Sequence, residues 1–224
     1  MAQASAGDRR NRRPLVHRGV EIVCGTRFED AARAEGLLAV AGLDEVGRGA
    51  LCGPVVACAV ILGQAFDSAG IDDSKRLTAL QREQQARRIR AGAFAVALGS
   101  ADHVEIDRLN ILCATHLAMK RALARLEAAL DLVLIDGRGE VPELGVRQRA
   151  IVKGDALSVS IAAASIVANV HRDAIMRECD VRFPGYGLAH NMGYASDDHR
   201  DALRRLGPSE IHRRSFNGTQ PWLF

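Results

Sequence analysis

Residues 42–49 read Gly-Leu-Asp-Glu-Val-Gly-Arg-Gly and close an apolar run that begins near residue 37. A buried strand is expected over residues 37–46, because the run is apolar and two glycines follow it closely. A second apolar run follows the Gly53-Pro54 turn at residues 55–62, and a third strand is expected at residues 94–98. Three strands so close in sequence predict an antiparallel meander.

Helices dominate the rest of the chain. Thr78 and Gln81 have the spacing of a capping box, which predicts a helix from there to about residue 90. Apolar periodicity and helix-ending residues predict further helices at 28–35, 111–129, 158–179 and 198–206, and a short helix or turn at 102–110. Strands are expected at 130–135 and 149–152, and a loop over 180–198. This order predicts one α/β domain over residues 19–224, with a helical C-terminal extension from about residue 180.

Composition fits that fold. The chain has 224 residues, enough for one domain, and is 48% hydrophobic but only 4% aromatic, so small and aliphatic side chains must build the core. Its longest apolar run, residues 55–62, is far shorter than the roughly 20 residues that cross a bilayer, and residues 1–18 lack the apolar stretch of a signal peptide. We therefore expect a cytoplasmic protein. No CxxC spacing relates the cysteines, which we expect to be reduced thiols without a metal or redox role: Cys24, Cys52, Cys58, Cys113 and Cys179.

Net charge gives no general indication of a nucleic-acid partner. The formal charge is +3, but residues 1–18 carry +4, which leaves −1 for the other 206 residues. We interpret residues 1–18 as a flexible basic arm that the fold does not need. Five arginines lie within residues 200–214, and they form either a nucleic-acid contact or an ordinary solvated helix face.

Four acidic residues fall where strands and loops meet. Asp44 and Glu45 end one buried strand, Asp136 ends another, and Asp155 precedes the long helix expected at 158–179. An ionised carboxylate at a buried strand end is costly unless a cation or hydrogen bonds compensate it. An all-oxygen ligand set suits the hard ions Mg²⁺ and Mn²⁺. The pattern therefore predicts a shared divalent-metal site.

Each carboxylate also has a purely structural explanation. Asp155 can cap the following helix, Asp136 can be an Asp-Gly turn residue, and Asp44 and Glu45 can form a salt-bridged strand end. Neighbouring strand residues point to opposite faces of a sheet, so Asp44 and Glu45 cannot both reach one metal from a regular strand. Either the backbone bulges there, or Glu45 contributes differently, for example through its main-chain oxygen.

A series of sequence blocks, in one order over about residues 38–216, resembles bacterial ribonuclease HII, the type 2 ribonuclease H. A single glycine and acidic motif would be moderately specific, but so many ordered blocks are very specific. The blocks are Gly42 to Gly49, Gly53 to Ala57, Asp73-Ser74-Lys75, Glu105 to Asp107, Asn110-Ile111, Ala118-Met119, Ile135-Asp136-Gly137, Lys153-Gly154-Asp155, Ile161 to Ile166, Arg172-Asp173, Gly193-Tyr194 and His212 to Phe216.

The resemblance implies a ribonuclease H-like fold, in which helices flank a mixed five-stranded sheet. It implies that Asp44, Glu45, Asp136 and Asp155 are the catalytic cluster and hold two ions, Mn²⁺ or Mg²⁺. The expected reaction is two-metal-ion hydrolysis of the phosphodiester bond on the 5′ side of a ribonucleotide, which leaves 3′-hydroxyl and 5′-phosphate ends.

The resemblance also implies substrate contacts. The main chain of Gly47-Arg48-Gly49 would read the ribose 2′-hydroxyl, Tyr194 would pack on the neighbouring deoxyribose, and Ser74-Lys75 would bind substrate as well. Taken alone, Gly47-Arg48-Gly49 is equally a strand-ending turn, and Tyr194 a loop anchor. The expected partners are RNA/DNA hybrids and duplex DNA with single ribonucleotides, as in ribonucleotide excision repair. We expect a monomer without membrane contact.

The sequence departs from the family's common residues at a few positions. Asn169 and Met192 stand where lysine is common, Leu188 where phenylalanine is common, and Ala195-Ser196 where Pro-Thr or Gly-Thr is common. None is an acidic candidate, so duplex affinity rather than chemistry is in question, and the C-terminal arginines can compensate.

Three other functions fit parts of the pattern. One is another metal nuclease or nucleotidyl transferase on this fold, such as a type 1 ribonuclease H or an integrase-like enzyme. The second is a non-catalytic nucleic-acid-binding module. The third is a nucleotide-phosphate loop at residues 42–49, which lacks the following Gly-Lys-Ser/Thr that such a loop needs.

Overall fold

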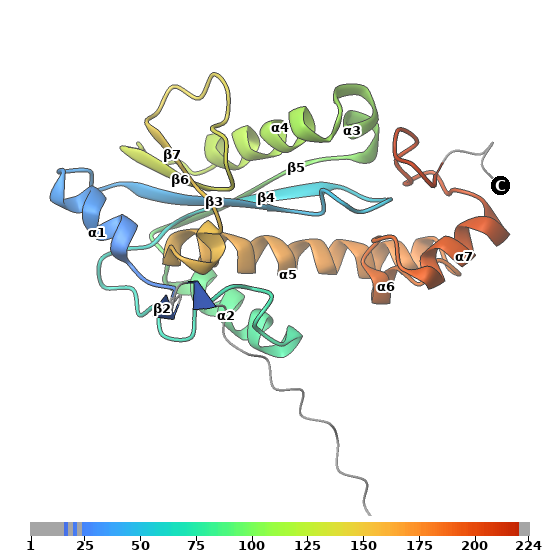
Figure 1. Ribbon diagram of the computed structural model, residues 1–224, viewed down its shortest axis with the longest axis horizontal. Coiled ribbons are helices and arrows are strands. Elements are labelled where there is room, and N and C mark those ends of the chain that lie inside the picture. Colours follow the sequence, from blue (N-terminus) through green and yellow to red (C-terminus); the bar gives the residue numbers. More distant parts are fainter. Residues whose placement is uncertain (1–15, 18–19, 22–23, 220–224) are drawn as a thin grey trace, which may run out of the picture.

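A five-stranded mixed sheet lies between two layers of helices (Figure 1). The computed structural model describes residues 16–17, 20–21 and 24–219. The strand order of the sheet is β5-β4-β3-β6-β7, and β3 pairs antiparallel with β4 and parallel with β6. The strands are β3 (Val40–Val46), β4 (Val55–Ile61), β5 (Ala95–Ala101), β6 (Leu132–Asp136) and β7 (Gln148–Ile151). The predicted α/β class, mixed five-stranded sheet and antiparallel meander are confirmed.

Helices cover both faces of this sheet. In Figure 1, α3 and α4 lie on one side, and α5 and α2 on the other. Along β4 the side chains alternate as a pleated strand requires: Ala57 and Ala59 join the core under α4, whereas Cys58 and Val60 join the core under α5. The helices are α2 (Ala79–Gly92), α3 (His103–Leu109), α4 (Ile111–Ala124) and α5 (Val159–Arg182).

Close contact between β3 and the start of α5 depends on Gly42. A Cβ atom on Gly42 would lie 2.1 Å from the carbonyl carbon of Ser160, so only glycine lets the two backbones approach this closely. The contact fixes α5 across the sheet next to the end of β3. Side chains at helical spacing along α5 can therefore reach the loops that follow the strands.

The remaining elements lie around this core of sheet and helices. The chain enters through β1, β2 and α1, and it leaves through α6 and α7, which pack on the far end of α5 (Figure 1). Leu188 is fully buried in that C-terminal cluster. The elements are β1 (Val16–His17), β2 (Val20–Glu21), α1 (Arg27–Ala34), the 3-10 turn η1 (Gly154–Ala156), α6 (Leu188–Asn191) and α7 (Asp197–Leu206).

Strand and helix ends differ from the sequence prediction by a few residues, and three differences are larger or change the assignment. Helix α4 ends at Ala124 instead of residue 129, because the chain turns there and Leu126 folds back into the core. Helix α6 lies in the predicted loop and is a single turn, too short to show a period in the sequence. Val16 and His17 of the predicted arm form β1, which pairs with β2, and the rest of the arm lies outside the described residues.

Two further observations concern the whole described chain. All five cysteines are free thiols. None of the helices in the described residues has the length and apolar character needed to cross a membrane.

Candidate active site

A cleft of about 380 Å³ opens where β3, β6, η1 and α5 meet. It collects every residue that the sequence analysis placed in the site, together with Val46 and two residues of α5. The lining consists of Asp44, Glu45, Val46, Gly47, Arg48, Gly49, Ser74, Lys75, Asp136, Asp155, Ser165, Asn169 and Tyr194.

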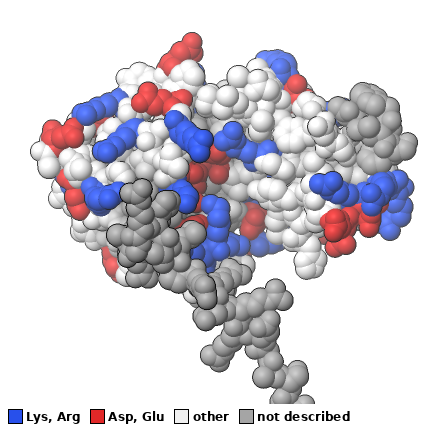
Figure 2. Space-filling model, viewed as in Figure 1, with Lys and Arg blue, Asp and Glu red and all other residues white. Residues whose placement is uncertain are grey.

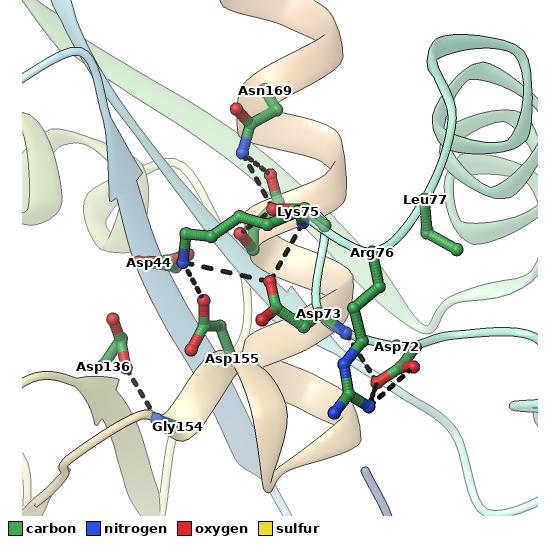
Figure 3. Close-up of polar contacts among 12 residues, drawn as sticks. Asp44, Asp72, Asp73, Lys75, Arg76, Leu77, Asp136, Gly154, Asp155 and Asn169 are labelled. Atoms are coloured by element: carbon green, nitrogen blue, oxygen red, sulfur yellow. Dashed lines mark hydrogen bonds and ion pairs between the residues drawn. The ribbon is translucent and has the colours of Figure 1, made fainter. Parts of the chain in front are cut away.

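The four candidate carboxylates reach this cleft from three elements. Asp44 and Glu45 come from β3, Asp136 from the end of β6, and Asp155 from η1. Asp136 Oδ1 accepts the main-chain N–H of Gly154 at 2.7 Å, which ties η1 to β6 (Figure 3). Asp155 does not cap α5, because the N-cap is Ser158. The helix-cap explanation for this residue is therefore wrong.

Asp44 and Glu45 lie on opposite faces of a strand without a bulge. The register of β3 with β4 is unbroken from Ala41 to Val46. Asp44 lies opposite Cys58 on the α5 face, and Glu45 lies opposite Ala57 on the α4 face, where it lines a second cavity of about 100 Å³. Both still reach the cleft, because the pairing of β3 with β6 stops at Leu43 and leaves that edge open.

Burial and like charge dominate the electrostatics of this cluster. Asp44 is 5% exposed, and burial, followed by the charges of Glu45 and Asp136, raises its pKa well above the usual range. Burial raises the pKa of Glu45 although Arg48 opposes the shift, and burial with the charge of Asp155 raises the pKa of Asp136. The cluster therefore lacks positive charge, which a divalent cation would supply.

One lysine partly offsets this charge. Lys75 Nζ donates to Asp155 Oδ2 at 2.5 Å and lies 3.9 Å from Asp73 Oδ1 (Figure 3). The Lys75 main chain is held, because its N–H donates to Asp73 Oδ1 at 2.9 Å, yet its side chain is 75% exposed. Lys75 is thus a tethered cation at the edge of the cluster.

Asn169 holds the loop that carries this lysine. Its amide donates to the carbonyl of Ser165 at 2.9 Å and to Ser74 Oγ at 3.4 Å, and the hydroxyls of Ser74 and Ser165 lie 3.1 Å apart. Ser165 and Asn169 are one helical turn apart on α5, so both face the same loop. At this position, where the sequence analysis expected a lysine from the resemblance, the chain therefore carries a neutral residue that supports the loop.

The glycine loop after β3 presents bare main chain to the cleft. Gly47 is buried with φ of +92°, a left-handed conformation that favours glycine. Gly49 is exposed, and a Cβ there would find its nearest neighbour, Tyr194 Cε1, at 4.0 Å. Between them Arg48 turns its guanidinium back to Glu45, with Nη1 3.0 Å from Oε1.

Tyr194 is anchored through its backbone rather than its ring. Its carbonyl accepts from His199 Nδ1 at 2.9 Å, and the preceding carbonyl, of Gly193, accepts from the N–H of Leu51 at 2.7 Å. The ring is 40% exposed, lies over Arg172 at 5.4 Å, and its hydroxyl has no hydrogen-bond partner in the described residues. The side chain therefore lines the cleft and is available for a contact there.

A buried pair of histidines supports the Tyr194 segment. The Tyr194 carbonyl can only accept, so His199 Nδ1 carries hydrogen, while His212 Nδ1 accepts the N–H of Ser209 at 3.0 Å. His212 Nε2–H consequently donates to His199 Nε2, 3.1 Å away. Cys52 lies within 4.8 Å of both ligand nitrogens, but the hydrogen on His212 Nε2 occupies the lone-pair direction that a metal would need. We assign this cluster to packing.

The predicted C-terminal basic patch is only partly on the surface. Arg213 and His212 are fully buried, which leaves Arg200, Arg204, Arg205 and Arg214 exposed. Figure 2 shows basic and acidic side chains mixed at the end of the molecule where α7 lies, and Arg204 pairs with Asp201 there. This mixture of charges is more typical of an ordinary solvated helix face than of a nucleic-acid contact.

Sequence reasoning missed three residues around the cleft. Ser165 was not singled out, although its i, i+4 spacing to Asn169 on a helix is a usable signal. Arg172 appeared only in a matching block, and Arg213 only in a block and in the predicted basic patch, yet both are fully buried beneath the glycine loop. No sequence pattern distinguishes a buried arginine from an exposed one when its partners are main-chain carbonyls.

Comparison with known proteins identifies the family. The sequence model described as Ribonuclease HII matches residues 41–219 of this chain. The chain belongs to the ribonuclease HII family. Members of the family from Synechococcus sp. (strain JA-3-3Ab) and Cereibacter sphaeroides (strain ATCC 17029 / ATH 2.4.9) are 53% and 54% identical to it. These matches cover 85% and 88% of this chain and 86% and 93% of the relatives.

Solved structures agree with this assignment. Ribonuclease H2 from Pyrococcus horikoshii OT3 matches with a TM-score of 0.68 at 25% identity, over 81% of this chain and 95% of that one. The RNase HII in the PCNA complex from Archaeoglobus fulgidus matches with a TM-score of 0.68 at 27% identity, over 81% and 97%. As a member of the ribonuclease HII family, the chain is a ribonuclease H enzyme, and the non-catalytic and phosphate-loop alternatives are wrong.

Proposed function

We propose that this member of the ribonuclease HII family cuts the phosphodiester bond on the 5′ side of ribonucleotides, in RNA/DNA hybrids and at single ribonucleotides in duplex DNA. The products are 3′-hydroxyl and 5′-phosphate ends. The observation that carries the proposal is the meeting of four carboxylates and an exposed glycine main chain in one cleft. The carboxylates suit the phosphodiester, and the bare main chain suits the adjoining sugar.

The residues of the cleft fit two divalent ions, Mn²⁺ or Mg²⁺, held by Asp44, Glu45, Asp136 and Asp155. All of these side chains offer oxygen, and no histidine or cysteine lines the cleft in the described residues. The raised pKa of Asp44 and Asp136 supports the fit, because a nearby cation would favour their ionised forms. When bound, such ions supply an activated water and stabilise the leaving oxygen.

The chain's own side chains bind and orient the nucleic acid. Lys75 and Arg48 are exposed cations on two walls of the cleft, each within reach of a phosphate that lies over the carboxylates. The Gly47-Arg48-Gly49 main chain contacts the ribose 2′-hydroxyl, and the Tyr194 ring packs on the neighbouring deoxyribose. Ser74, held by Ser165, keeps Lys75 beside the cluster.

This activity places the enzyme in ribonucleotide excision repair. We propose that it acts as a cytoplasmic monomer, and that RNA/DNA hybrids and ribonucleotide-containing DNA are its partners.

A cleavage map tests substrate, bond and cofactor together. A labelled duplex with one ribonucleotide is incubated with the protein and Mg²⁺ or Mn²⁺, with a chelator in the control. We expect a single cut on the 5′ side of the ribonucleotide, products with 3′-hydroxyl and 5′-phosphate ends, and no cut in the chelator control. Cleavage of long hybrids but not of the single ribonucleotide would indicate a type 1 specificity and contradict the proposal. A cut on the 3′ side would contradict the proposed bond.

A further inference from the structure

Two fully buried arginines, Arg172 and Arg213, lie beneath the loop of residues 47–54, and neither pairs with a carboxylate in the described part of the chain. A guanidinium has five N–H donors in a fixed plane. Both side chains direct these donors to main-chain carbonyls, so they act on the backbone of the loop rather than on another charge.

Arg213 binds three carbonyls of this loop. Its Nη2 donates to the carbonyl of Gly47 at 2.7 Å and its Nη1 to that of Arg48 at 3.0 Å. Its Nε and Nη2 both donate to the carbonyl of Gly53, at 3.0 and 2.9 Å. The ring of Phe216 packs on the guanidinium, 5.1 Å from its central carbon. Arg213 thus fixes both ends of the loop.

Arg172 joins the loop to the segment that carries Tyr194. It donates from Nε to the carbonyl of Pro54 at 3.0 Å, and from Nη1 to that of Met192 at 2.8 Å. A Cβ on Gly47 would lie 2.2 Å from Arg172 Nε, so this glycine leaves room for the arginine. The two elements proposed to contact the sugars are therefore held by one side chain.

The grip on two successive carbonyls has a stereochemical consequence. In a planar trans peptide the C=O and the next N–H point in opposite directions. Arg213 draws the carbonyls of Gly47 and Arg48 inward, so the N–H groups of Arg48 and Gly49 point away from it. No acceptor in the described residues takes either N–H, and both residues are exposed at the cleft. The loop therefore presents two adjacent free donors.

We propose that Arg172 and Arg213 are positioning residues for sugar recognition: Arg213 aims the N–H groups of Arg48 and Gly49 at the 2′-oxygen, and Arg172 sets their separation from Tyr194. The inference rests on the proposed function. A buried arginine is costly, and an apolar side chain of similar volume would fill the space more cheaply. What the arginine adds is a rigid fork that fixes the orientation of peptide groups.

The test compares sugars rather than total activity. Two duplexes differ only at one position, which is either a ribonucleotide or its 2′-fluoro analogue, a much poorer acceptor. The ratio measured is kcat/KM on the ribonucleotide duplex divided by kcat/KM on the 2′-fluoro duplex. For Arg213→Met we expect this ratio to fall at least about tenfold, because the hydrogen bonds from the loop no longer favour the hydroxyl. Affinity for an all-DNA duplex, which depends on phosphate contacts, should change less than about twofold. Rates are measured well below each variant's Tm.

Two further variants sharpen the result. Arg213→Lys keeps the charge but not the fork, and it should lower the ratio as Arg213→Met does. Arg182→Met, an exposed arginine on the same helix as Arg172, is the matched control and should leave the ratio unchanged. If neither Arg213 variant folds, Phe216→Leu removes the ring packed on the guanidinium and should still lower the ratio about threefold.

The outcomes separate this inference from the proposed function. Equal losses on both duplexes, with an unchanged ratio, would overturn the positioning role and leave a purely structural one. An unchanged ratio in Phe216→Leu, where that variant is the only one that folds, would do the same. A wild-type protein that cuts neither duplex would instead contradict the proposed function, before any variant is compared.

Discussion

The ammonium group of Lys75 lies 2.5 Å from the carboxylate of Asp155, one of four carboxylates in the cleft. Burial alone would lower the pKa of Lys75, yet the hydrogen bond to Asp155 and the neighbouring carboxylates raise it. Lys75 therefore competes with any cation that Asp155 binds.

Removing this competitor should strengthen metal binding. We expect Lys75→Met to bind Mn²⁺ up to about fivefold more tightly, the equivalent of roughly 1 kcal/mol for an exposed ion pair, as measured by calorimetry without nucleic acid. Lys153→Met is the control, because Lys153 is exposed nearby and makes no ion pair with a described residue. Unchanged or weaker binding in Lys75→Met would show that Lys75 supports the site instead.

Neutralising one carboxylate should separate chemistry from stability. Asp44→Asn and Asp136→Asn should each reduce cleavage by more than about 100-fold, because the cluster loses a ligand. Without metal, the Tm should stay the same or rise, because burial and like charge disfavour the ionised forms of both residues. Asp131→Ala is the converse control: it removes the acceptor for two N–H groups just before β3 and should lower the Tm without altering turnover. Near wild-type cleavage in either asparagine variant refutes the cluster assignment.

The two glycines of the loop should behave differently. Gly47→Ala puts a Cβ 2.2 Å from Arg172 at φ of +92°, so we expect it to destabilise the fold by about 2–4 kcal/mol and to reduce all cleavage. Gly49→Ala meets no protein atom closer than 4.0 Å and should leave stability within about 0.5 kcal/mol of wild type. Its cleavage should still fall, because the added methyl group points at the sugar. Full activity in Gly49→Ala would show that no sugar approaches this main chain.

Tyr194→Ala should alter substrate preference. Since the ring makes no hydrogen bond and the segment is anchored by its backbone, the Tm should change little. Cleavage at a single ribonucleotide should fall more than cleavage of a continuous RNA/DNA hybrid, because only the former has a deoxyribose at the junction. Tyr194→Phe should act as wild type. The claim fails if Tyr194→Ala reduces both activities in equal proportion.

The histidine pair should make stability depend on pH. Burial, followed by the charge of His199, lowers the pKa of His212 to about 4, against about 6.5 in an unfolded chain. Folding therefore keeps His212 neutral, and its contribution is complete above pH ~6.5 and is lost as the pH falls toward ~4, by up to about 3 kcal/mol.

Comparing wild type with His212→Gln isolates this effect, because the raised carboxylate pKa values act on both proteins alike. Glutamine can still accept from Ser209 and donate to His199. Chemical denaturation should show a stability difference that shrinks between pH 7.5 and pH 5. A difference that does not vary with pH would mean that His212 is not buried in its neutral form.

Much of the fold and the site could be predicted from local sequence. The strands around Asp44 and Asp136 are apolar runs stopped by glycine, and their parallel pairing brings the two carboxylates together. The cap explanation of Asp155 failed because this residue lies three positions before the true N-cap, Ser158. Helix α6 could not be predicted because a single helical turn is too short to show a hydrophobic period in the sequence.

The supporting contacts could not be predicted because they join residues far apart in the chain through the backbone. Arg213 binds a carbonyl 166 positions away, and neither partner has a side-chain signal for the other. The pairing of His199 with His212 depends on tautomers, which only the surrounding carbonyl and N–H groups determine. The sequence did predict that Asp44 and Glu45 point to opposite faces of their strand. It did not predict that β3 stops pairing with β6 at Leu43, which lets both side chains reach the cleft.

Helix α5 connects all these parts, because Ser165, Asn169 and Arg172 project from it at successive turns and Gly42 seats it on β3. The helix therefore fixes both the spacing along its axis and the angular positions of the side chains that hold the loops. One inserted residue between Ser165 and Arg172 would turn the rest of the helix by about 100° and move Arg172 away from its carbonyls, while Ser74 stayed in place. Substitutions at the exposed positions in the second half of α5 should therefore be tolerated more readily than insertions or deletions within the helix.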